Sequence, residues 1–305
     1  MEFTGLFPAV VTPFLDDLRV DHSGIAKLSR SLLEGGGVSG LVANSNAAEV
    51  WALSIEEQAA CVRTMKDEAG DGVPVVSGLA PRSLGEGKRT LDAVQSAGAD
   101  GVLVMPLPEW AIGMDPAAAV RYHEELSRAS SIPLVAFQVP RSSAASYSSE
   151  LLAQIVRVSG VSAVKEAVWD LTRYARDLRA TRDADPSVRI LSGIDEFVFD
   201  TLQIGADGML LAIGCLMAPE LDEIHRLLKH GDLHAARDRN DQVQPLLTGL
   251  YGPEAFGKRH ATLKACLYEL RLIDSPVVRP PATVVRRVPD GLRAALTEFQ
   301  NAKRA

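Results

Sequence analysis

The stretch GADGVLVMP, residues 98–106, contains the end of a helix, a buried strand and the start of a loop. Gly98 is typical of a residue that terminates a helix. The apolar run from Val102 to Val104 is continuous rather than alternating, which suits a parallel strand covered on both faces. The same arrangement returns as GADGMLLAI at residues 205–213. Two such units predict a fold in which helices and parallel strands alternate.

Working outward, we find eight short apolar runs, which start at Leu6, Gly40, Pro74, Gly101, Pro133, Val161, Val188 and Gly208. Helical patterns separate them: Ser54 and Glu57 form a capping box, and Pro219 suits a helix start. Eight strand–helix units in about 230 residues predict a (β/α)8 TIM barrel. A doubly wound open sheet is the alternative, but the glycine fingerprint expected after its first strand is missing.

The strand rhythm stops after about Lys229. Three helical patterns follow, at residues 233–247, 258–270 and 290–303, and a proline-rich connector joins the last two. We therefore predict a barrel over residues 1–230 and a C-terminal helical extension over residues 231–305.

Composition limits the class of protein. The 305 residues are 47% hydrophobic and carry a net charge of −7, which disfavours nucleic acid and anionic membrane as partners. No apolar run is long enough to span a bilayer, and the N-terminus does not read as a signal peptide. The three cysteines have no metal-ligand spacing. We expect a cytoplasmic protein without a metal or a cofactor.

Function in such barrels gathers at the C-terminal ends of the strands. Lys165, at the end of the sixth run, is the only lysine on any predicted strand. If its side chain points inward, desolvation lowers its pKa, and a neutral amine can attack a carbonyl to form a Schiff base. The alternative is a structural lysine that forms an ion pair with Glu166 or with a neighbouring carboxylate. None of the six histidines follows a strand, so no catalytic histidine is expected, and His123 and His225 are expected on helix surfaces.

Several motifs occur in a fixed order: GLFPAVVTPF, GLVANSNAAEVWALSIEEQ, GADGVLVMP, PLVAFQVP, AVKEA, LSGIDE and GADGMLLAI. Together they cover about residues 3–220, and the series resembles the dihydrodipicolinate synthase/N-acetylneuraminate lyase family. The resemblance implies a class I lyase, either an aldolase or a hydro-lyase, that acts on pyruvate or another 2-oxo acid and an aldehyde. It also implies a homo-oligomer, a tetramer or a dimer.

The resemblance also implies roles for individual residues. Lys165 would carry the Schiff base, and the turn of Ser45, Asn46 and Ala47 would bind the carboxylate of the oxo acid, partly through backbone N–H groups. Gly193 and Ile213 fall where the family closes the substrate pocket.

Three hydroxyl groups that relay protons in the family are missing here. Phe137 stands at the relay tyrosine, Ala47 at the second threonine of the turn, and Leu107 in the tyrosine pair after the fourth strand. Arg141 lies one place before the arginine that recognises substrate in the synthases. We therefore expect a poor dihydrodipicolinate synthase, in which another group moves the proton; the candidates are Gln138, Glu49, Glu109, Asp170 and an ordered water.

The far end of the substrate is predicted from aromatic side chains. Trp110 follows the fourth strand, Phe137 ends the fifth and Trp169 follows the sixth, so the three would rim one sector of the barrel mouth. An apolar, even aromatic, partner carbonyl is then expected. The alternative is that both indoles anchor loops on the helices.

Two other functions stay open from the sequence. One is a barrel with a phosphate site at the loops of Gly193 and Gly214. The other is a catalytically silent binding or regulatory barrel that retains Lys165 by inheritance.

Overall fold

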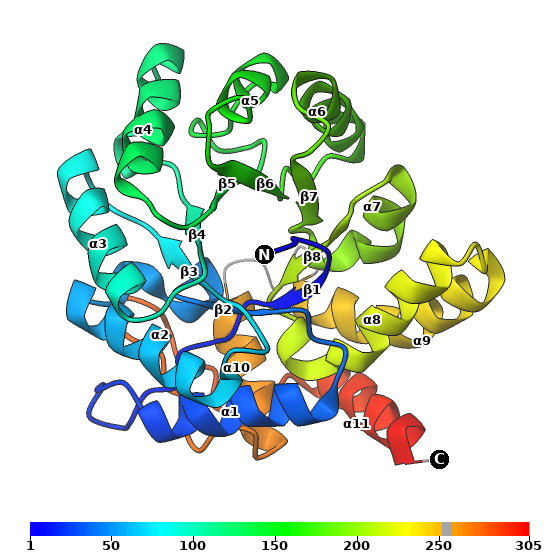
Figure 1. The fold of residues 1–305 in the computed structure, drawn as a ribbon. Coiled ribbons are helices and arrows are strands. Elements are labelled where there is room, and N and C mark those ends of the chain that lie inside the picture. The colour runs from blue at the N-terminus through cyan, green and yellow to red at the C-terminus, as the bar shows by residue number, and fades with distance from the viewer. Residues whose placement is uncertain (252–257, 305) are drawn as a thin grey trace.

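The computed structural model describes residues 1–251 and 258–304. Eight parallel strands form one sheet that curls into a barrel (Figure 1). Their bounds are β1 Gly5–Pro8, β2 Leu41–Ala43, β3 Val75–Leu79, β4 Gly101–Val104, β5 Leu134–Gln138, β6 Val161–Glu166, β7 Arg189–Ser192 and β8 Gly208–Leu211. Each strand starts within one residue of its predicted start, and the predicted TIM barrel is confirmed.

The order of the strands decides between the two predicted architectures. The strands follow the order β1-β8-β7-β6-β5-β4-β3-β2, so neighbours in sequence are neighbours in the sheet. The two ends of this series meet because Ala9 and Val42 form an isolated parallel bridge. The Val10 N–H donates to the Val42 carbonyl at 3.0 Å. The sheet is therefore a nearly closed barrel rather than an open doubly wound sheet.

Helices surround the strands as a ring (Figure 1). Their bounds are α1 His22–Gly35, α2 Ile55–Ala69, α3 Leu84–Ser96, α4 Pro116–Ala129, α5 Ser149–Ile155, α6 Leu171–Ala184, α7 Val198–Ile204 and α8 Gly214–Lys229. Single turns of 3-10 helix follow several strands: η1 Asn46–Ala48, η2 Val50–Ala52, η3 Pro108–Ala111 and η4 Asp195–Phe197. These turns carry residues from the strand ends over the barrel mouth.

Local sequence signals explain several helix ends. Ser54 and Glu57 form the predicted capping box at the start of α2. The repeated glycines Gly98 and Gly205 have φ of 97° and 119°, a conformation that favours glycine and ends α3 and α7. Within α8 the backbone is non-helical at Met217, two residues before Pro219, so the regular helix restarts near this proline.

The C-terminal extension consists of α9 Leu233–Tyr251, α10 Arg259–Glu269 and α11 Asp290–Arg304. Helix α9 packs against α8 and α11 on one side of the barrel (Figure 1). The buried Lys264 of α10 forms an ion pair with Glu49, which follows β2. This pair holds α10 near the C-terminal end of β2.

The interior contains one group that the sequence placed incorrectly. His123 is fully buried, with its ring beside those of Tyr122 and Tyr147, and its Nδ1 donates to the Ala119 carbonyl at 2.9 Å. Burial lowers the pKa of His123 to about 4. The expectation of a surface histidine is therefore wrong here, whereas His225 is half-buried.

Two further observations concern the described part of the chain. Cys61, Cys215 and Cys266 are all buried and none forms a disulfide. Among these described residues we find no helix with the length and apolar character needed to cross a bilayer.

Candidate active site

Lys165 lies on β6 with its side chain inside the barrel. In the parallel ladders it is aligned with Phe137 of β5 and Leu191 of β7. Its Nζ lies 4.7 Å from the centre of the Phe137 ring, and only 8% of the residue is exposed. Glu166, the next residue, points to the opposite side of the sheet because side chains alternate along a strand. No Lys165–Glu166 ion pair occurs in the described chain.

Burial controls the chemistry of this amine. It lowers the pKa of Lys165 from 10.5 to about 8, because the charged form loses its water. The negative charge of Asp195 acts in the opposite direction, and the positive charge of Arg259 lowers the pKa further. A substantial fraction of the amine is therefore neutral near physiological pH.

Asp195 is the carboxylate beside Lys165, and the sequence did not single it out. It is buried on η4, and its Oδ1 accepts the backbone N–H of Ile213 at 2.9 Å. Burial raises the pKa of Asp195, although the Ile213 N–H and the nearby charges of Lys165 and Arg259 oppose this effect. The carboxyl group can therefore hold a proton more readily than an exposed aspartate. The only signal in the sequence was its position after β7.

Gly193 leaves space for the Lys165 side chain. A Cβ built on this glycine would lie 3.0 Å from Cε of Lys165 and 2.9 Å from Cβ of Ala167. Any larger residue would push the amine out of place. Gly193 and Ile213, both predicted at the pocket, thus lie next to Lys165 and Asp195 respectively.

The turn after β2 supplies backbone donors. Ser45 caps η1, and its Oγ accepts the Ala48 N–H at 3.3 Å. The first N–H groups of a helical turn, here those of Asn46 and Ala47, have no partner within the turn. Ser45 and Ala47 are buried, whereas Asn46 is half-buried at the mouth.

The C-terminal extension contributes three side chains that sequence reasoning missed. Tyr251 at the end of α9 is buried close to Asp195; burial raises the pKa of its phenol, and the negative charge of Asp195 raises it further. The Arg259 guanidinium lies 5.3 Å from the centre of the Trp169 ring. The pKa of His260 falls to about 3 through burial and the positive charges of Arg259 and Lys165. Only the packing of α9 and α10 on the barrel reveals these residues.

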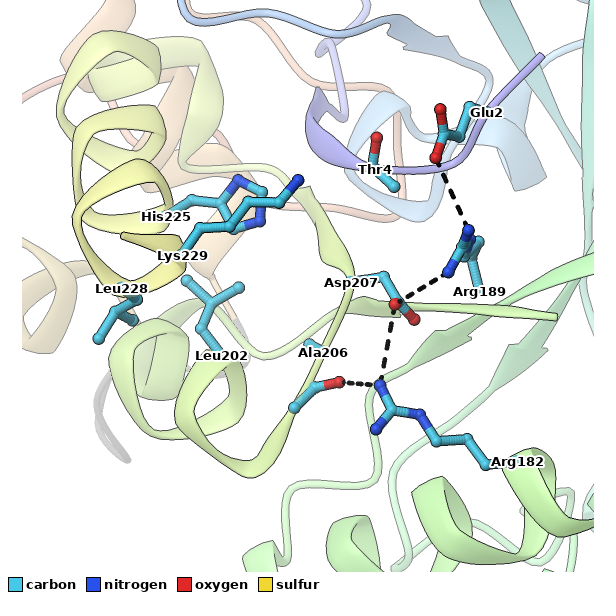
Figure 2. A pocket seen from close by; sticks show the side chains of 11 residues that line it. Glu2, Thr4, Arg182, Arg189, Leu202, Ala206, Asp207, His225, Leu228 and Lys229 are labelled. Carbon is cyan, nitrogen blue, oxygen red and sulfur yellow. Dashed lines mark hydrogen bonds and ion pairs between the residues drawn. The ribbon is translucent and has the colours of Figure 1, made fainter. Parts of the chain in front are cut away.

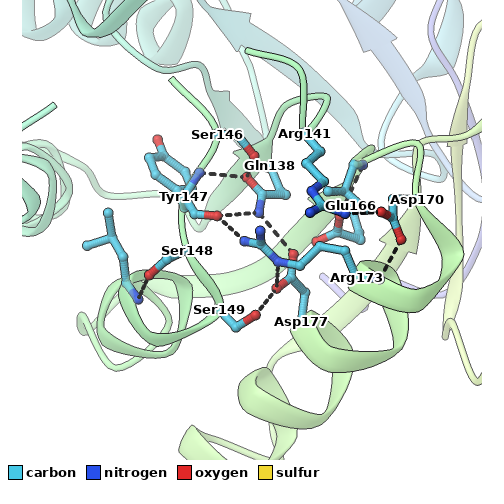
Figure 3. A network of polar contacts seen from close by, with 12 residues as sticks. Gln138, Arg141, Ser146, Tyr147, Ser148, Ser149, Glu166, Asp170, Arg173 and Asp177 are labelled. Carbon is cyan, nitrogen blue, oxygen red and sulfur yellow. Dashed lines mark hydrogen bonds and ion pairs between the residues drawn. The ribbon is translucent and has the colours of Figure 1, made fainter. Parts of the chain in front are cut away.

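Gln138 does not enter the site. Its side chain leaves the barrel on the side opposite to Phe137 and joins a buried network (Figure 3). Its Nε2 donates to the Tyr147 carbonyl at 2.9 Å and to Asp177 at 3.0 Å, and its Oε1 accepts the Tyr147 N–H at 3.0 Å. The prediction that Gln138 touches substrate or moves a proton is corrected, because the strand alternation turns it outward.

The other candidate proton carriers are engaged or exposed. Glu49 binds Lys264 and also accepts the Arg279 backbone N–H at 2.8 Å. Asp170 caps α6 and forms an ion pair with Arg141 (Figure 3). Glu109 is exposed on η3. None of the three is paired with Lys165 in the described structure.

Trp110 and Trp169, which were predicted to rim the barrel mouth with Phe137, do not lie beside it. Trp110 is buried and packs edge-on against Tyr122 and Tyr147, with ring centres 5.5 and 6.3 Å apart. Trp169 donates from its indole N–H to Glu196 at 3.0 Å. Trp110 is thus a loop anchor, as the alternative held, and Trp169 belongs to the sector of Arg259. The aromatic residue at the rim beside Phe137 is instead Trp51, which is 50% exposed.

A polar cavity of about 330 Å³ lies at the N-terminal ends of the strands, opposite to Lys165 (Figure 2). Asp207 pairs with two arginines in the cavity wall: it lies 3.5 Å from Arg189 and 3.8 Å from Arg182. The Asp207 carboxylate also accepts the Ile190 N–H at 2.8 Å. These contacts fix the N-terminal ends of β7 and β8, an end of TIM barrels that serves stability rather than catalysis.

Comparison with known proteins agrees with this architecture. A sequence model of the dihydrodipicolinate synthetase family matches residues 2–296. The chain belongs to the dihydrodipicolinate synthetase family. Relatives in this family carry the name 4-hydroxy-tetrahydrodipicolinate synthase.

Two relatives show how similar this chain is in sequence to other family members. The 4-hydroxy-tetrahydrodipicolinate synthase of Methanospirillum hungatei is 29% identical over 258 residues, which cover 82% of this chain and 84% of the relative. The enzyme of the same name from Bifidobacterium longum is 27% identical over 298 residues, or 96% of this chain and 95% of the relative.

Solved structures of the family share the fold. Dihydrodipicolinate synthase from Thermotoga maritima superposes with a TM-score of 0.87 at 21% identity, covering 99% of this chain and 98% of that one. YagE from E. coli K12, solved in complex with pyruvate, has a TM-score of 0.87 at 24% identity and covers 99% of both chains. At these identities the likeness concerns the fold alone.

Proposed function

We propose that this family member is a Schiff-base lyase that makes or breaks a bond next to the carbonyl of pyruvate or another 2-oxo acid. The observation that carries the proposal is the buried amine of Lys165, whose pKa is lowered to about 8 and which lies beside the carboxyl group of Asp195. A relative of the same fold was solved with pyruvate, which favours this oxo acid as the substrate.

The proposed covalent step uses Lys165 as the nucleophile. Its neutral amine attacks C2 of the oxo acid, water leaves, and an imine forms. Loss of a proton from C3 then gives an enamine whose carbon attacks an aldehyde; cleavage is the reverse. The carboxylate of the oxo acid accepts hydrogen bonds from the N–H groups of Asn46 and Ala47. These groups lie at the start of the turn η1, where the backbone dipoles favour a negative charge.

Asp195 is our candidate for the group that moves the proton. It replaces the predicted candidates because it lies beside Lys165 and because burial raises its pKa. Positioned acids and bases contribute about 100- to 10,000-fold to rate. Phe137, Ala47 and Leu107 supply no hydroxyl group, so we expect little dihydrodipicolinate synthase activity.

Borohydride trapping tests the proposal. Incubation with pyruvate and borohydride should add one reduced pyruvate to the chain, and peptide mapping should locate it on Lys165. Lys264 is a matched internal control, since its pKa is also lowered to about 8 but its Nζ is bound to Glu49. Lys165→Arg should abolish the adduct.

Adducts on Lys264 or on surface lysines only, or none with a panel of 2-oxo acids, would overturn the proposal. Such a result would favour the second candidate, a catalytically silent binding barrel. The missing relay hydroxyl groups at Phe137, Ala47 and Leu107 support this candidate. A phosphate barrel has less support, because Gly193 packs on Lys165 and a Cβ on Gly214 would lie 3.2 Å from Pro8.

A further inference from the structure

A cavity of about 340 Å³ opens at the barrel mouth beside the reactive amine. It is bounded by the ends of β2, β4 and β5, and Phe137 forms part of its wall. Lys165 itself does not line the cavity, but its Nζ lies 4.7 Å from the centre of the Phe137 ring. Asn46, in the turn expected to hold the carboxylate, also lines the cavity. A molecule attached to Lys165 can therefore extend past Phe137 into this space.

The wall of this cavity is almost entirely carbon. Met105 and Leu107 follow β4, Val139 follows β5, and Trp51 stands at the rim. Among the described lining residues, none carries a charge, and the polar side chains besides the Trp51 indole are those of Asn46 and Ser143. The Ser143 Oγ already accepts the Ala145 N–H at 3.2 Å.

Size and polarity together indicate the ligand. A dry apolar cavity of about 150 Å³ is enough to bind benzene, so about 340 Å³ accommodates a phenyl ring and its substituents. A hydroxyl group buried there loses its hydrogen bonds to water and gains no partner, which disfavours a polyhydroxy substituent. A carboxylate would find no cation among the described residues that line the cavity.

We propose that this cavity binds the apolar end of the second substrate, an aldehyde whose substituent is about the size of a phenyl ring. The proposal rests on the function proposed above. In synthesis the enamine carbon of pyruvate bonds to the aldehyde carbon, whose oxygen takes up a proton. Water then hydrolyses the imine and releases Lys165 together with a 4-hydroxy-2-oxo acid that bears the apolar group. The reverse reaction cleaves that acid.

Paired aldehydes test the inference. The wild-type chain is given pyruvate with either benzaldehyde or glyceraldehyde, and product formation is measured as kcat/KM for each. We expect at least about a 10-fold preference for benzaldehyde, the lower end of what one apolar contact contributes to specificity. In Leu107→Asn the ratio should fall about 10-fold, because an amide then faces the ring. Leu107→Met keeps the apolar wall and should retain the ratio.

Trp110→Phe is a second control, since Trp110 lies outside the cavity and the ratio should not change. Imine trapping with pyruvate alone is measured on every variant to check that the site is intact. A normal pyruvate adduct with equal or faster reaction of glyceraldehyde, or with no product from either aldehyde, would overturn this inference and leave the Schiff-base function standing. Absence of the adduct in the wild type would overturn both.

Discussion

At the scale of single residues, burial and two neighbouring charges determine the pKa of Lys165. Burial favours the neutral amine, Arg259 favours it further, and Asp195 favours the ammonium. The balance holds the pKa near 8, where the amine is both available as a nucleophile and able to be protonated. Both neighbours come from segments other than β6, so the balance is a property of the assembled mouth.

The first prediction concerns the pH dependence of adduct formation. Only the neutral amine reacts, so the rate of pyruvate adduct formation should rise with pH and level off above a midpoint near 8. Asp195→Asn removes the charge that stabilises the ammonium and should move the midpoint lower. Arg259→Gln removes a positive charge and should move it higher. Midpoints that shift in the same direction, or a wild-type midpoint near that of free lysine, would contradict this account.

The second prediction concerns stability. The folded-state pKa of Lys165 lies below its unfolded value, so the buried ammonium destabilises the fold at any pH below 8. A shift from 10.5 to about 8 corresponds to about 3 kcal/mol. Lys165→Met should therefore stabilise the chain by up to that amount at pH 7. The gain should shrink as the pH rises from 8 to 10.5, because the folded chain has lost this proton above pH 8 and the unfolded chain loses it near pH 10.5.

Urea unfolding at pH 7 and at pH 10 measures this difference directly. Lys27→Met is a suitable control, since Lys27 is partly exposed and pairs with Asp274 on the surface. A Lys165→Met chain that is less stable than wild type at pH 7 would show that the amine stabilises the fold.

At the scale of elements, the last two side chains of β5 point to opposite sides of the sheet. Phe137 faces the barrel, whereas Gln138 faces the helices and binds the Tyr147 backbone and Asp177 (Figure 3). Asp177 of α6 also accepts Arg173 Nε at 2.7 Å and Ser149 Oγ at 2.6 Å. The network therefore joins β5, the start of α5 and α6 on the outer face of the sheet.

The third prediction tests this network. Gln138→Ala removes one of the hydrogen bonds to Asp177 and one of those to the Tyr147 carbonyl, and it takes away the acceptor of the buried Tyr147 N–H. The free energy of unfolding should therefore fall by about 2–4 kcal/mol. Gln138→Met fills the space but restores no hydrogen bond, and it should also destabilise. Adduct formation at Lys165, assayed in the folded fraction, should persist. A loss below about 0.5 kcal/mol in both variants would contradict the structural role.

At the scale of the whole molecule, the extension closes one sector of the mouth. Arg279, in the connector after α10, donates to the Leu18 carbonyl at 2.8 Å and to the Ala52 carbonyl at 2.6 Å, and it forms an ion pair with Glu57. Its side chain is only 16% exposed. These bonds hold the connector against the barrel near the strand-two turn.

The fourth prediction follows from these bonds. Arg279→Leu leaves Glu57 and two carbonyl groups without the guanidinium and should lower the free energy of unfolding by about 2–4 kcal/mol. Arg287→Leu is the matched control, because Arg287 pairs with Asp290 on an exposed surface and should change stability little. Equal effects of the two substitutions in urea unfolding would contradict a special role for Arg279.

Several features followed from the sequence alone. Continuous apolar runs at a regular spacing specify parallel strands, because each strand must be covered on both faces. The helix ends at Gly98 and Gly205 and the capping box at Ser54 are local signals that need only a few residues. Lys165 stood out for the same local reason, as a lysine at the end of an apolar strand. The homo-oligomer and the domain boundary near residue 230 stay predictions.

Only the tertiary structure decided which side chains meet Lys165. Successive side chains of a strand point to opposite faces, so Gln138 points away from the site while the neighbouring Phe137 faces Lys165. Trp110 is drawn into a buried aromatic cluster, and Trp51, which carried no signal, reaches the rim. Asp195, Tyr251 and Arg259 lie far from Lys165 in sequence. Contacts of this kind depend on how strands, turns and the extension pack, and no local pattern encodes them.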